Sequence, residues 1–223
     1  MNTGDTAFMM ICAALVFFMT PGLAFFYGGL VRRKNVCNTI MACVAIMGLS
    51  VVMWTLFGYS LSFGGNHAGI IGDFRWFGLN GVGMEAGPYA DSIPHLVFCA
   101  FQMMFAMITP ALITGSLVGR MKFKALFLFV AIWSVIVYYP MAHMVWGDGG
   151  FLAAIGSVDF AGGDVVHISS GISALVLAII LGRRRGYEHT TYRIHNIPSV
   201  VLGASLLWFG WFGFNAGSAL KAD

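Results

Sequence analysis

Long apolar runs, separated by short polar segments, dominate the hydrophobic pattern of this chain. A helix that crosses a hydrocarbon core of about 30 Å needs roughly 20 apolar residues. Six runs meet that length or come close to it, and none of them contains Asp, Glu, Lys or Arg: Ala7–Val31, Val36–Phe63, Ile93–Gly119, Ala125–Trp146, Val165–Gly182 and Ile197–Leu220. The pattern predicts an all-α, polytopic membrane protein in which residues 1–223 form a single membrane domain with six spans.

The amino-acid composition also indicates a membrane protein. Hydrophobic residues make up 59% of the 223 residues and charged residues 9%, whereas a soluble domain carries about 25% charged residues. A net charge of +3 is too small to indicate a nucleic-acid partner. The four cysteines lie in or beside apolar runs without metal-type spacing, so we expect small core residues, no metal site and no cofactor.

The distribution of basic residues predicts the orientation of the spans. Ten of the twelve Lys and Arg residues lie in alternate loops: Arg32, Arg33, Lys34, Arg120, Lys122, Lys124, Arg183, Arg184, Arg185 and Arg193. The positive-inside rule places these loops in the cytoplasm and the amino terminus outside. Asp5 stands where a signal peptide would carry basic residues, so the first span should remain in the protein. We therefore expect a multi-pass protein of the plasma (inner) membrane.

Two segments with alternating aromatic and small residues suggest an internal repeat. Gly22–Gly29 in the first span resembles Gly210–Gly217 in the sixth. Many transporters are built from inverted repeats, with the substrate site between the halves. If the sixth span restarts the pattern, the domain consists of one five-helix repeat and the first helix of a second. Pro21 and Pro110 should each remove a backbone hydrogen bond and bend their helices.

Ionisable residues inside apolar spans are the first candidates for function, because burying them in a membrane is costly. His167 lies near the start of the fifth span, and helical spacing would put Asp164, Ser170 and Gly171 on its face. A neutral imidazole both donates and accepts hydrogen bonds and exchanges protons near neutral pH. The alternative is a buried histidine bonded to a neighbouring helix. His95 starts the third span and reads as an interfacial residue.

Asp159 opens the fifth span, and two interpretations of it are compatible. It can cap the helix amino terminus, which contributes about 1 kcal/mol. Its negative charge can also stabilise a cation at the outer mouth of the bundle without touching it.

A set of aromatic residues points to a cation vestibule. Phe101 and Phe105 are one helical turn apart in the third span, Phe214 lies in the sixth, and Trp146 ends the fourth. Each alone is typical of packing or of a membrane-interface belt. Together they suggest a site where aromatic faces attract a small cation.

Five segments, spread over the whole chain, resemble the ammonium transporter family, also called the methylammonium permease and Rhesus family. They are Ala7–Cys12, Pro21–Leu30, Ala142–Gly147, Asp159–His167 and Trp211–Ser218. The resemblance implies the ammonium-transporter fold of about eleven spans, truncated here after the sixth transmembrane helix. The second pore imidazole and half of the pore wall would then lie beyond Asp223.

The resemblance also implies roles for the outer residues. Trp146 and Ser218 would form the site that recruits ammonium, with Phe101 and Phe105 lining it. Asp159 would be the acid that favours ammonium at the entrance.

For the pore, the resemblance implies a gate and a dry pathway. Phe105 and Phe214 would be the stacked gate below the vestibule, and His167 one of two imidazoles in an apolar pore. Gln102 would line the deeper pathway or its back wall. Ammonium would lose a proton and cross as ammonia. Potassium has no proton to lose and would be excluded.

The implied partners are ammonium or ammonia, with methylammonium as an analogue, the lipid bilayer, two further copies in a homotrimer, and a PII-type regulatory protein. Two alternatives stay open: an ammonium sensor of the same family, and a secondary transporter for another small cation. An enzyme is not expected, because Ser205 lacks the flanking glycine of a rhomboid-like nucleophile. Asp164 and His167 supply only two ligands, too few for a zinc site.

Overall fold

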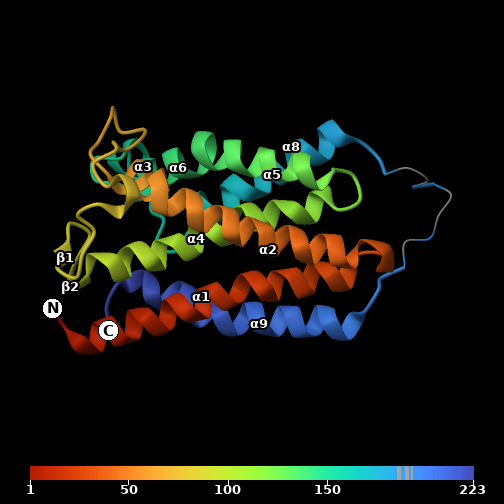
Figure 1. Cartoon of the computed structure of the whole chain (residues 1–223), viewed down its shortest axis with the longest axis horizontal. Coiled ribbons are helices and arrows are strands. Elements are labelled where there is room, and N and C mark those ends of the chain that lie inside the picture. The colour runs from red at the N-terminus through yellow and green to blue at the C-terminus, as the bar shows by residue number, and fades with distance from the viewer. Residues whose placement is uncertain (185–186, 189–190, 192) are drawn as a thin grey trace.

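Six membrane-length helical segments run along the long axis of the computed structural model (Figure 1). The structure describes residues 1–184, 187–188, 191 and 193–223, so Arg185 of the predicted basic loops lies outside the described residues. Within that part of the chain the six segments are Thr3–Leu30, Arg33–Phe63, His95–Leu117, Phe123–Ala154, Gly163–Leu181 and Ile197–Ala219. Each corresponds to one predicted span, which confirms the predicted fold class of an integral membrane protein.

Within the described residues, five of the spans contain an uninterrupted α-helix of 13 residues or more. These are α1 (Thr3–Leu30), α2 (Val36–Met53), α4 (His95–Leu117), α8 (Ser169–Leu181) and α9 (Ile197–Ala216). Pro21 and Pro110 lie inside α1 and α4, and neither ends its helix. A proline costs a membrane helix one backbone hydrogen bond, which packed neighbours tolerate.

Three of the spans contain a π-helical turn. The second span runs through α2 (Val36–Met53), a π turn (Trp54–Gly58) and α3 (Tyr59–Phe63), and the fourth through α5 (Phe123–Trp133), a π turn (Ser134–Tyr138) and α6 (Tyr139–Trp146). The fifth begins with a π turn at Gly163–Ile168, before α8. A short helix, α7 (Phe151–Ala154), follows α6. An extra residue in a turn rotates the side chains that follow it, so helical spacing alone does not predict which residues share a face there.

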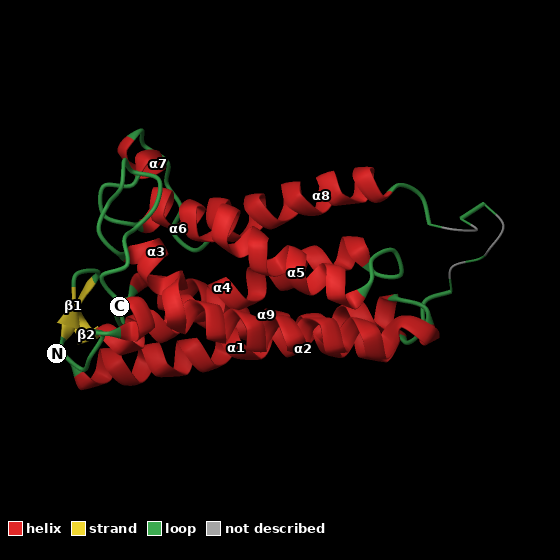
Figure 2. Ribbon diagram, turned by 45° about the horizontal axis from the view of Figure 1, so that its top comes forward, coloured by secondary structure: helices red, strands yellow, loops and turns green. Residues whose placement is uncertain are grey.

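Helices α1 and α9 lie side by side in Figures 1 and 2, with their backbones in contact through glycines. A Cβ atom added at Gly203 would lie 2.3 Å from the backbone nitrogen of Phe26, and one at Gly22 would lie 3.2 Å from the carbonyl oxygen of Gly203. Small residues allow such approach between membrane helices. The two glycine-rich segments that resemble each other therefore lie on touching helices.

A folded cap covers one end of the bundle, which we call the hairpin end. It contains residues 64–94 with the antiparallel strands β1 (Ala86–Gly87) and β2 (Ala90–Pro94), drawn in yellow in Figure 2. The amino terminus joins the cap, because the backbone N–H of Asn2 donates to the carbonyl of Ser92. Both chain termini lie at this end (Figure 1).

Asp73 organises the cap through its carboxylate. Its Oδ1 atom accepts the backbone N–H groups of Gly65 and Arg75, each at 3.0 Å, and the Arg75 guanidinium forms an ion pair with it at 3.1 Å. Partial burial works to raise the pKa of Asp73, but these N–H donors and the Arg75 charge outweigh it and hold the pKa below its usual range. The ionised carboxylate is therefore the form that the folded cap favours.

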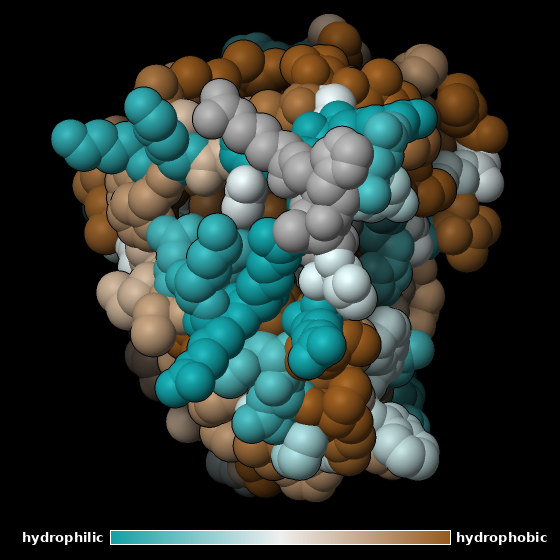
Figure 3. Space-filling model, turned by 90° about the vertical axis from the view of Figure 1, so that its right-hand side faces the viewer, coloured by the Kyte–Doolittle hydropathy of each residue, from teal (hydrophilic) through white to brown (hydrophobic). Residues whose placement is uncertain are grey.

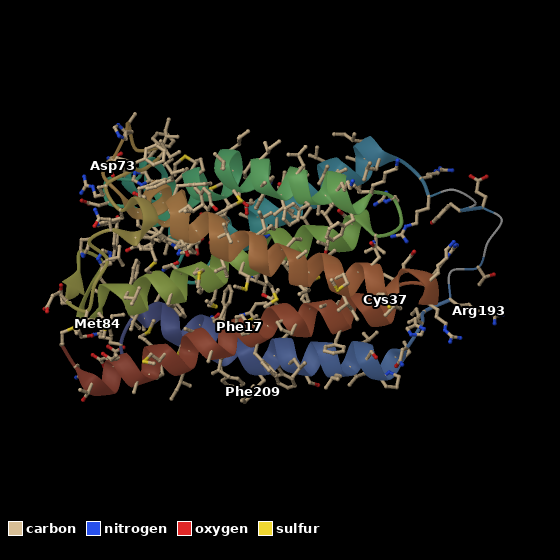
Figure 4. All side chains as sticks on the ribbon, viewed as in Figure 1. Phe17, Cys37, Asp73, Met84, Arg193 and Phe209 are labelled. Carbon is tan, nitrogen blue, oxygen red and sulfur yellow. The ribbon has the colours of Figure 1, made fainter. Side chains whose placement is uncertain are left out.

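The opposite end, which we call the basic end, carries the three loops rich in Lys and Arg. Figure 4 labels Asp73 and Met84 near the hairpin end and Cys37 and Arg193 near the basic end. Arg32 and Arg33 precede α2, Arg120 lies between α4 and α5, and Arg183 follows α8. Most of the positive charge of the molecule therefore lies at the basic end.

Candidate functional site

A cavity of about 380 Å³ opens at the hairpin end between α4, α6 and the segments beside α8 and α9. Five predicted site residues line it: Gln102, Phe105, Trp146, Asp159 and Ser218. The others in its wall are Phe63, Tyr89, Phe98, Val145, Phe160 and Leu220. Apart from Asp159 and three polar side chains, the wall is aromatic or aliphatic. Among the described residues, none that lines it is Lys, Arg or His.

Asp159 is held by the start of the fifth span. Its carboxylate accepts four backbone N–H groups: those of Gly162 and Gly163 on Oδ1, at 2.5 and 2.8 Å, and those of Asp164 and Val165 on Oδ2, at 2.8 and 3.0 Å. These are the N–H groups that a helix start leaves without partners. These bonds agree with the interpretation of Asp159 as a helix cap, and Asp159 is also one of the residues that line the cavity.

Trp146 is fixed to the same loop. Its indole N–H donates to the carbonyl of Asp159 at 2.9 Å, and its ring stands edge-on to Phe105 with centroids 5.8 Å apart. The bond satisfies the only polar group of the indole. The tryptophan therefore offers the cavity a ring, not a hydrogen bond.

A stack of phenylalanine rings lies beside the cavity. The rings of Phe105 and Phe214 lie 4.3 Å apart at 34°, and Phe101 meets Phe105 at 5.0 Å. All three side chains are at most 2% exposed. Phe101 does not line the cavity; it packs against Gly217, where an added Cβ would lie 2.6 Å from its ring. Phe101 thus supports the stack from behind.

Two lining residues of the cavity, Ser218 and Gln102, carry oxygen atoms that can accept hydrogen bonds. The Ser218 hydroxyl donates to the carbonyl of Phe214 at 2.9 Å, which leaves its oxygen lone pairs as acceptors. The Oε1 atom of Gln102 is buried and accepts no hydrogen bond from the part of the chain that the structure describes. A buried acceptor without a donor costs about 1–3 kcal/mol, so a ligand that donates would relieve it.

His167 lies next to the phenylalanine stack but outside the cavity wall. It belongs to the π turn at Gly163–Ile168, and its ring is stacked on Trp211 with centroids 5.7 Å apart and lies 6.1 Å from Phe214. His167 is exposed, although its ring lies against these two residues of α9. The Asp164 carboxylate accepts the Ser157 hydroxyl at 2.6 Å. Asp164 and His167 both lie in the π turn, where α-helical spacing does not predict which residues share a face.

Sequence reasoning missed the aromatic wall contributed by the cap. Tyr89 stacks on Phe98 at 5.2 Å and 6°, and its hydroxyl donates to the carbonyl of Phe63 at 2.7 Å. Burial raises the pKa of the Tyr89 phenol above its ordinary value. In the sequence, Phe63 and Phe98 look like any other residues of the apolar spans. Tyr89 belongs to no periodic pattern that would predict its position.

His95, expected at the membrane interface, lies at the start of α4 beneath the cap. Its side chain is buried and hydrogen-bonded to the Tyr59 hydroxyl, with Trp76 stacked on Tyr59. A buried imidazole needs such a partner, and the cap segment that carries Trp76 covers it. No group of three His, Cys, Asp or Glu side chains able to hold a metal ion occurs among the described residues.

The arrangement suits a small cation that donates hydrogen bonds. Aromatic faces and a nearby carboxylate attract positive charge. Acceptor oxygens without donors favour a ligand with N–H groups over one without them.

Comparisons with known proteins identify the family of the chain. Residues 7–223 match the model of the Ammonium Transporter Family. The chain is 52% identical to an ammonium transporter of Bacillus subtilis (strain 168) over 223 residues and 46% identical to Ammonium transporter Amt1 of Archaeoglobus fulgidus, also over 223 residues. Each alignment covers 100% of this chain and 54% of the relative. The chain thus spans about half the length of these curated relatives.

Solved structures show the same fold. The crystal structure of Saccharomyces cerevisiae Mep2 matches with a TM-score of 0.90 and 36% identity, over 100% of this chain and 51% of that one. A structure described as a Sensor Amt Protein matches with a TM-score of 0.87 and 31% identity, over 99% of this chain and 56% of the other.

Proposed function

The chain belongs to the ammonium transporter family, and we propose that it supplies the entrance and one wall of a pore that carries ammonium across the membrane. The observation that carries the proposal is the cavity at the hairpin end, where the Trp146 and Phe105 rings meet the oxygens of Ser218 and Gln102. This is a transport role and not an enzymatic one. The proposal concerns the whole protein, of which these six helices form the part described.

Recruitment at the cavity depends on partial desolvation of the cation. Ammonium presents four N–H donors, and the Ser218 and Gln102 oxygens can accept two of them. The aromatic faces attract the charge, and a desolvated cation–π contact contributes about 2 kcal/mol. The charge of Asp159, fixed by its four backbone donors, adds a favourable field without direct contact.

Beyond the cavity, the proposed step is loss of a proton. Stripping water from an ion costs far more than a few aromatic contacts return. We infer that the Phe105–Phe214 stack opens to pass the substrate, that His167 lines the dry pathway, and that ammonia crosses it. Potassium has no proton to lose and would be rejected at the stack.

The proposed orientation places the hairpin end outside the plasma membrane and the basic end in the cytoplasm. The alternating basic loops support it. We further propose that three copies assemble, and that a PII-type protein acts on the cytoplasmic face. The exposed apolar surfaces of α1 and α9, which include Phe17, Phe18, Phe209 and Phe212, suit lipid or neighbouring copies.

Uptake of labelled methylammonium tests the pathway. The complete gene product is expressed in cells without other ammonium uptake, as wild type and with Phe105→Ala or His167→Ala. We expect each variant to lower uptake about tenfold or more, since loss of about 1.4 kcal/mol corresponds to a factor of ten. Phe127→Ala on the exposed surface of α5 and His195→Ala in the loop before α9 are the matched controls. If neither site variant changed uptake or selectivity, the pore assignment would be wrong.

A sensor is the second candidate, supported by the likeness to the Sensor Amt Protein. The two candidates share the cavity and differ in flux. Binding of methylammonium to the purified wild-type protein, without uptake in cells at matched expression, would favour the sensor.

A further inference from the structure

A second cavity opens at the basic end, opposite the cavity of the candidate site. Its volume is about 510 Å³, larger than the cavity at the hairpin end. Residues from three separate loops line it. Five of these residues are cationic, namely Arg32, Lys34, Arg120, Arg183 and Arg184, and the other three are Asn35, Gly119 and Leu181. Figure 3 looks onto this end, where hydrophilic side chains gather toward the middle of the face and apolar ones toward the rim.

Acidic residues do not balance these charges. Of the nine acids in the sequence, only Glu188 belongs to the loops of the basic end, against ten Lys and Arg residues. Glu188 forms an ion pair with Arg183 at 2.7 Å, and the two side chains are 66% and 79% exposed. Exposed pairs of this kind contribute little. The cavity therefore keeps a strong positive potential.

The wall of the cavity is a fixed structure. The Arg120 guanidinium donates to the carbonyls of Gly182 at 2.8 Å and Ala178 at 3.3 Å, and to that of Ser116. It therefore ties the loop after α4 to the last turn of α8. Its Nε–H is buried and has no acceptor among the described residues. Gly119, at φ +70°, brings the backbone beside the Asn35 amide, since an added Cβ would lie 3.0 Å from Asn35 Nδ2. The donors are thus preorganised.

The positive-inside rule explains the sign of these loops but not the convergence of five cations on one cavity. Like charges held together repel unless a counter-ion joins them. A phosphate group carries up to two negative charges and several acceptor oxygens, and arginine forks match its geometry. Basic pockets between membrane helices bind anionic head groups. We propose that this cavity is a binding site for a phosphate group, presented by an anionic phospholipid or by a soluble phosphate compound.

Binding to the complete gene product in neutral detergent tests the proposal. Three probes are titrated and detected by native mass spectrometry: phosphatidylglycerol, phosphatidylcholine as the neutral lipid, and inorganic pyrophosphate. We expect phosphatidylglycerol or pyrophosphate to bind, and the double variant Lys34→Gln/Arg183→Gln to weaken that binding about tenfold or more. Arg120 is left intact because it holds helix ends.

The matched control is Arg33→Gln/Lys124→Gln, which removes the same charge from exposed positions outside the cavity wall. Retention of phosphatidylglycerol alone identifies a lipid head group as the source, whereas binding of pyrophosphate identifies a soluble phosphate. The proposal is overturned if neither anionic probe binds more tightly than phosphatidylcholine. It is also overturned if both double variants weaken binding equally, since the attraction would then be diffuse.

Discussion

At the scale of single residues, the Asp159 carboxylate is the group of the candidate site that accepts the most hydrogen bonds. Each of its two oxygens accepts two backbone N–H groups, and the four donors are those of residues 162 to 165. In Asp159→Asn one oxygen is replaced by an NH₂ group that faces two donors. We expect this variant to lower the free energy of unfolding by about 2 kcal/mol or more, because hydrogen bonds to charged groups contribute about 1.5–3 kcal/mol each. Thermal unfolding in detergent measures it.

The control for this prediction is Asp91→Asn, an exposed acid in β2 of the cap. It removes the same charge from the same end of the molecule. Equal melting temperatures for Asp159→Asn and the wild-type protein would show that the hydrogen bonds of the Asp159 carboxylate to the start of the fifth span contribute nothing to stability.

The site residues differ in how far the sequence could predict them. Trp146, Phe105 and Phe214 were expected to lie together, and the structure brings them together with centroids 4.3 and 5.8 Å apart. Tyr89 could not be placed, since it comes from a cap segment whose fold depends on hydrogen bonds and not on a hydrophobic period. The spacing of Asp164 and His167 is also a weak guide, because both lie in a π turn, which changes the residues that share a face.

At the scale of elements, the contact between α1 and α9 depends on glycines. Gly203→Ala would place a Cβ atom 2.3 Å from the backbone nitrogen of Phe26. Backbone cannot move aside as a flexible side chain can, so the helices must separate. We expect a loss of about 1–3 kcal/mol, measured as a lower melting temperature of the purified protein.

Gly48 in α2 is the matched control, because nothing lies within 4 Å of its added Cβ atom. There the alanine gains only helix propensity, and Gly48→Ala should stabilise the protein by about 0.5–1 kcal/mol. Opposite signs for the two substitutions are the expected result. A neutral Gly203→Ala would contradict the proposed backbone contact.

The cap at the hairpin end should loosen in acid. The pKa of Asp73 is below its usual range in the folded protein, because N–H donors and Arg75 stabilise the ionised form. Its contribution is therefore complete above the unfolded pKa of about 3.9 and is lost as the pH falls through the folded pKa. We expect hydrogen exchange at the Gly65 and Arg75 amides to quicken below about pH 4, relative to the intrinsic rate. In Asp73→Asn these amides should exchange quickly at neutral pH, without the acid step.

The elements themselves were largely predictable, and the reason is the bilayer. Every backbone polar group must find a partner inside lipid, so apolar runs of this length become helices. The boundaries of α4 agree closely with the run Ile93–Gly119. The interruptions at Trp54–Gly58 and Ser134–Tyr138 were not predictable, because apolar composition is the same in α and π turns.

At the scale of the whole molecule, the separation of charge between the two ends predicts the orientation in the membrane, and native cysteines make it measurable. Cys12, Cys43 and Cys99 are buried, whereas Cys37 is exposed at the start of α2, at the basic end. A membrane-impermeant maleimide should therefore leave Cys37 unlabelled in intact cells and label it in inside-out vesicles.

The reciprocal probe is Met84→Cys, placed in a Cys37→Ser background. Met84 lies in the cap at the hairpin end and is 63% exposed. The new thiol should react in intact cells and be protected in inside-out vesicles, the reverse of Cys37. Labelling of Cys37 in intact cells would reverse the orientation. The aromatic cavity would then open to the cytoplasm and the proposed recruitment of ammonium from outside would fail, whereas the phosphate site would remain testable at the other face.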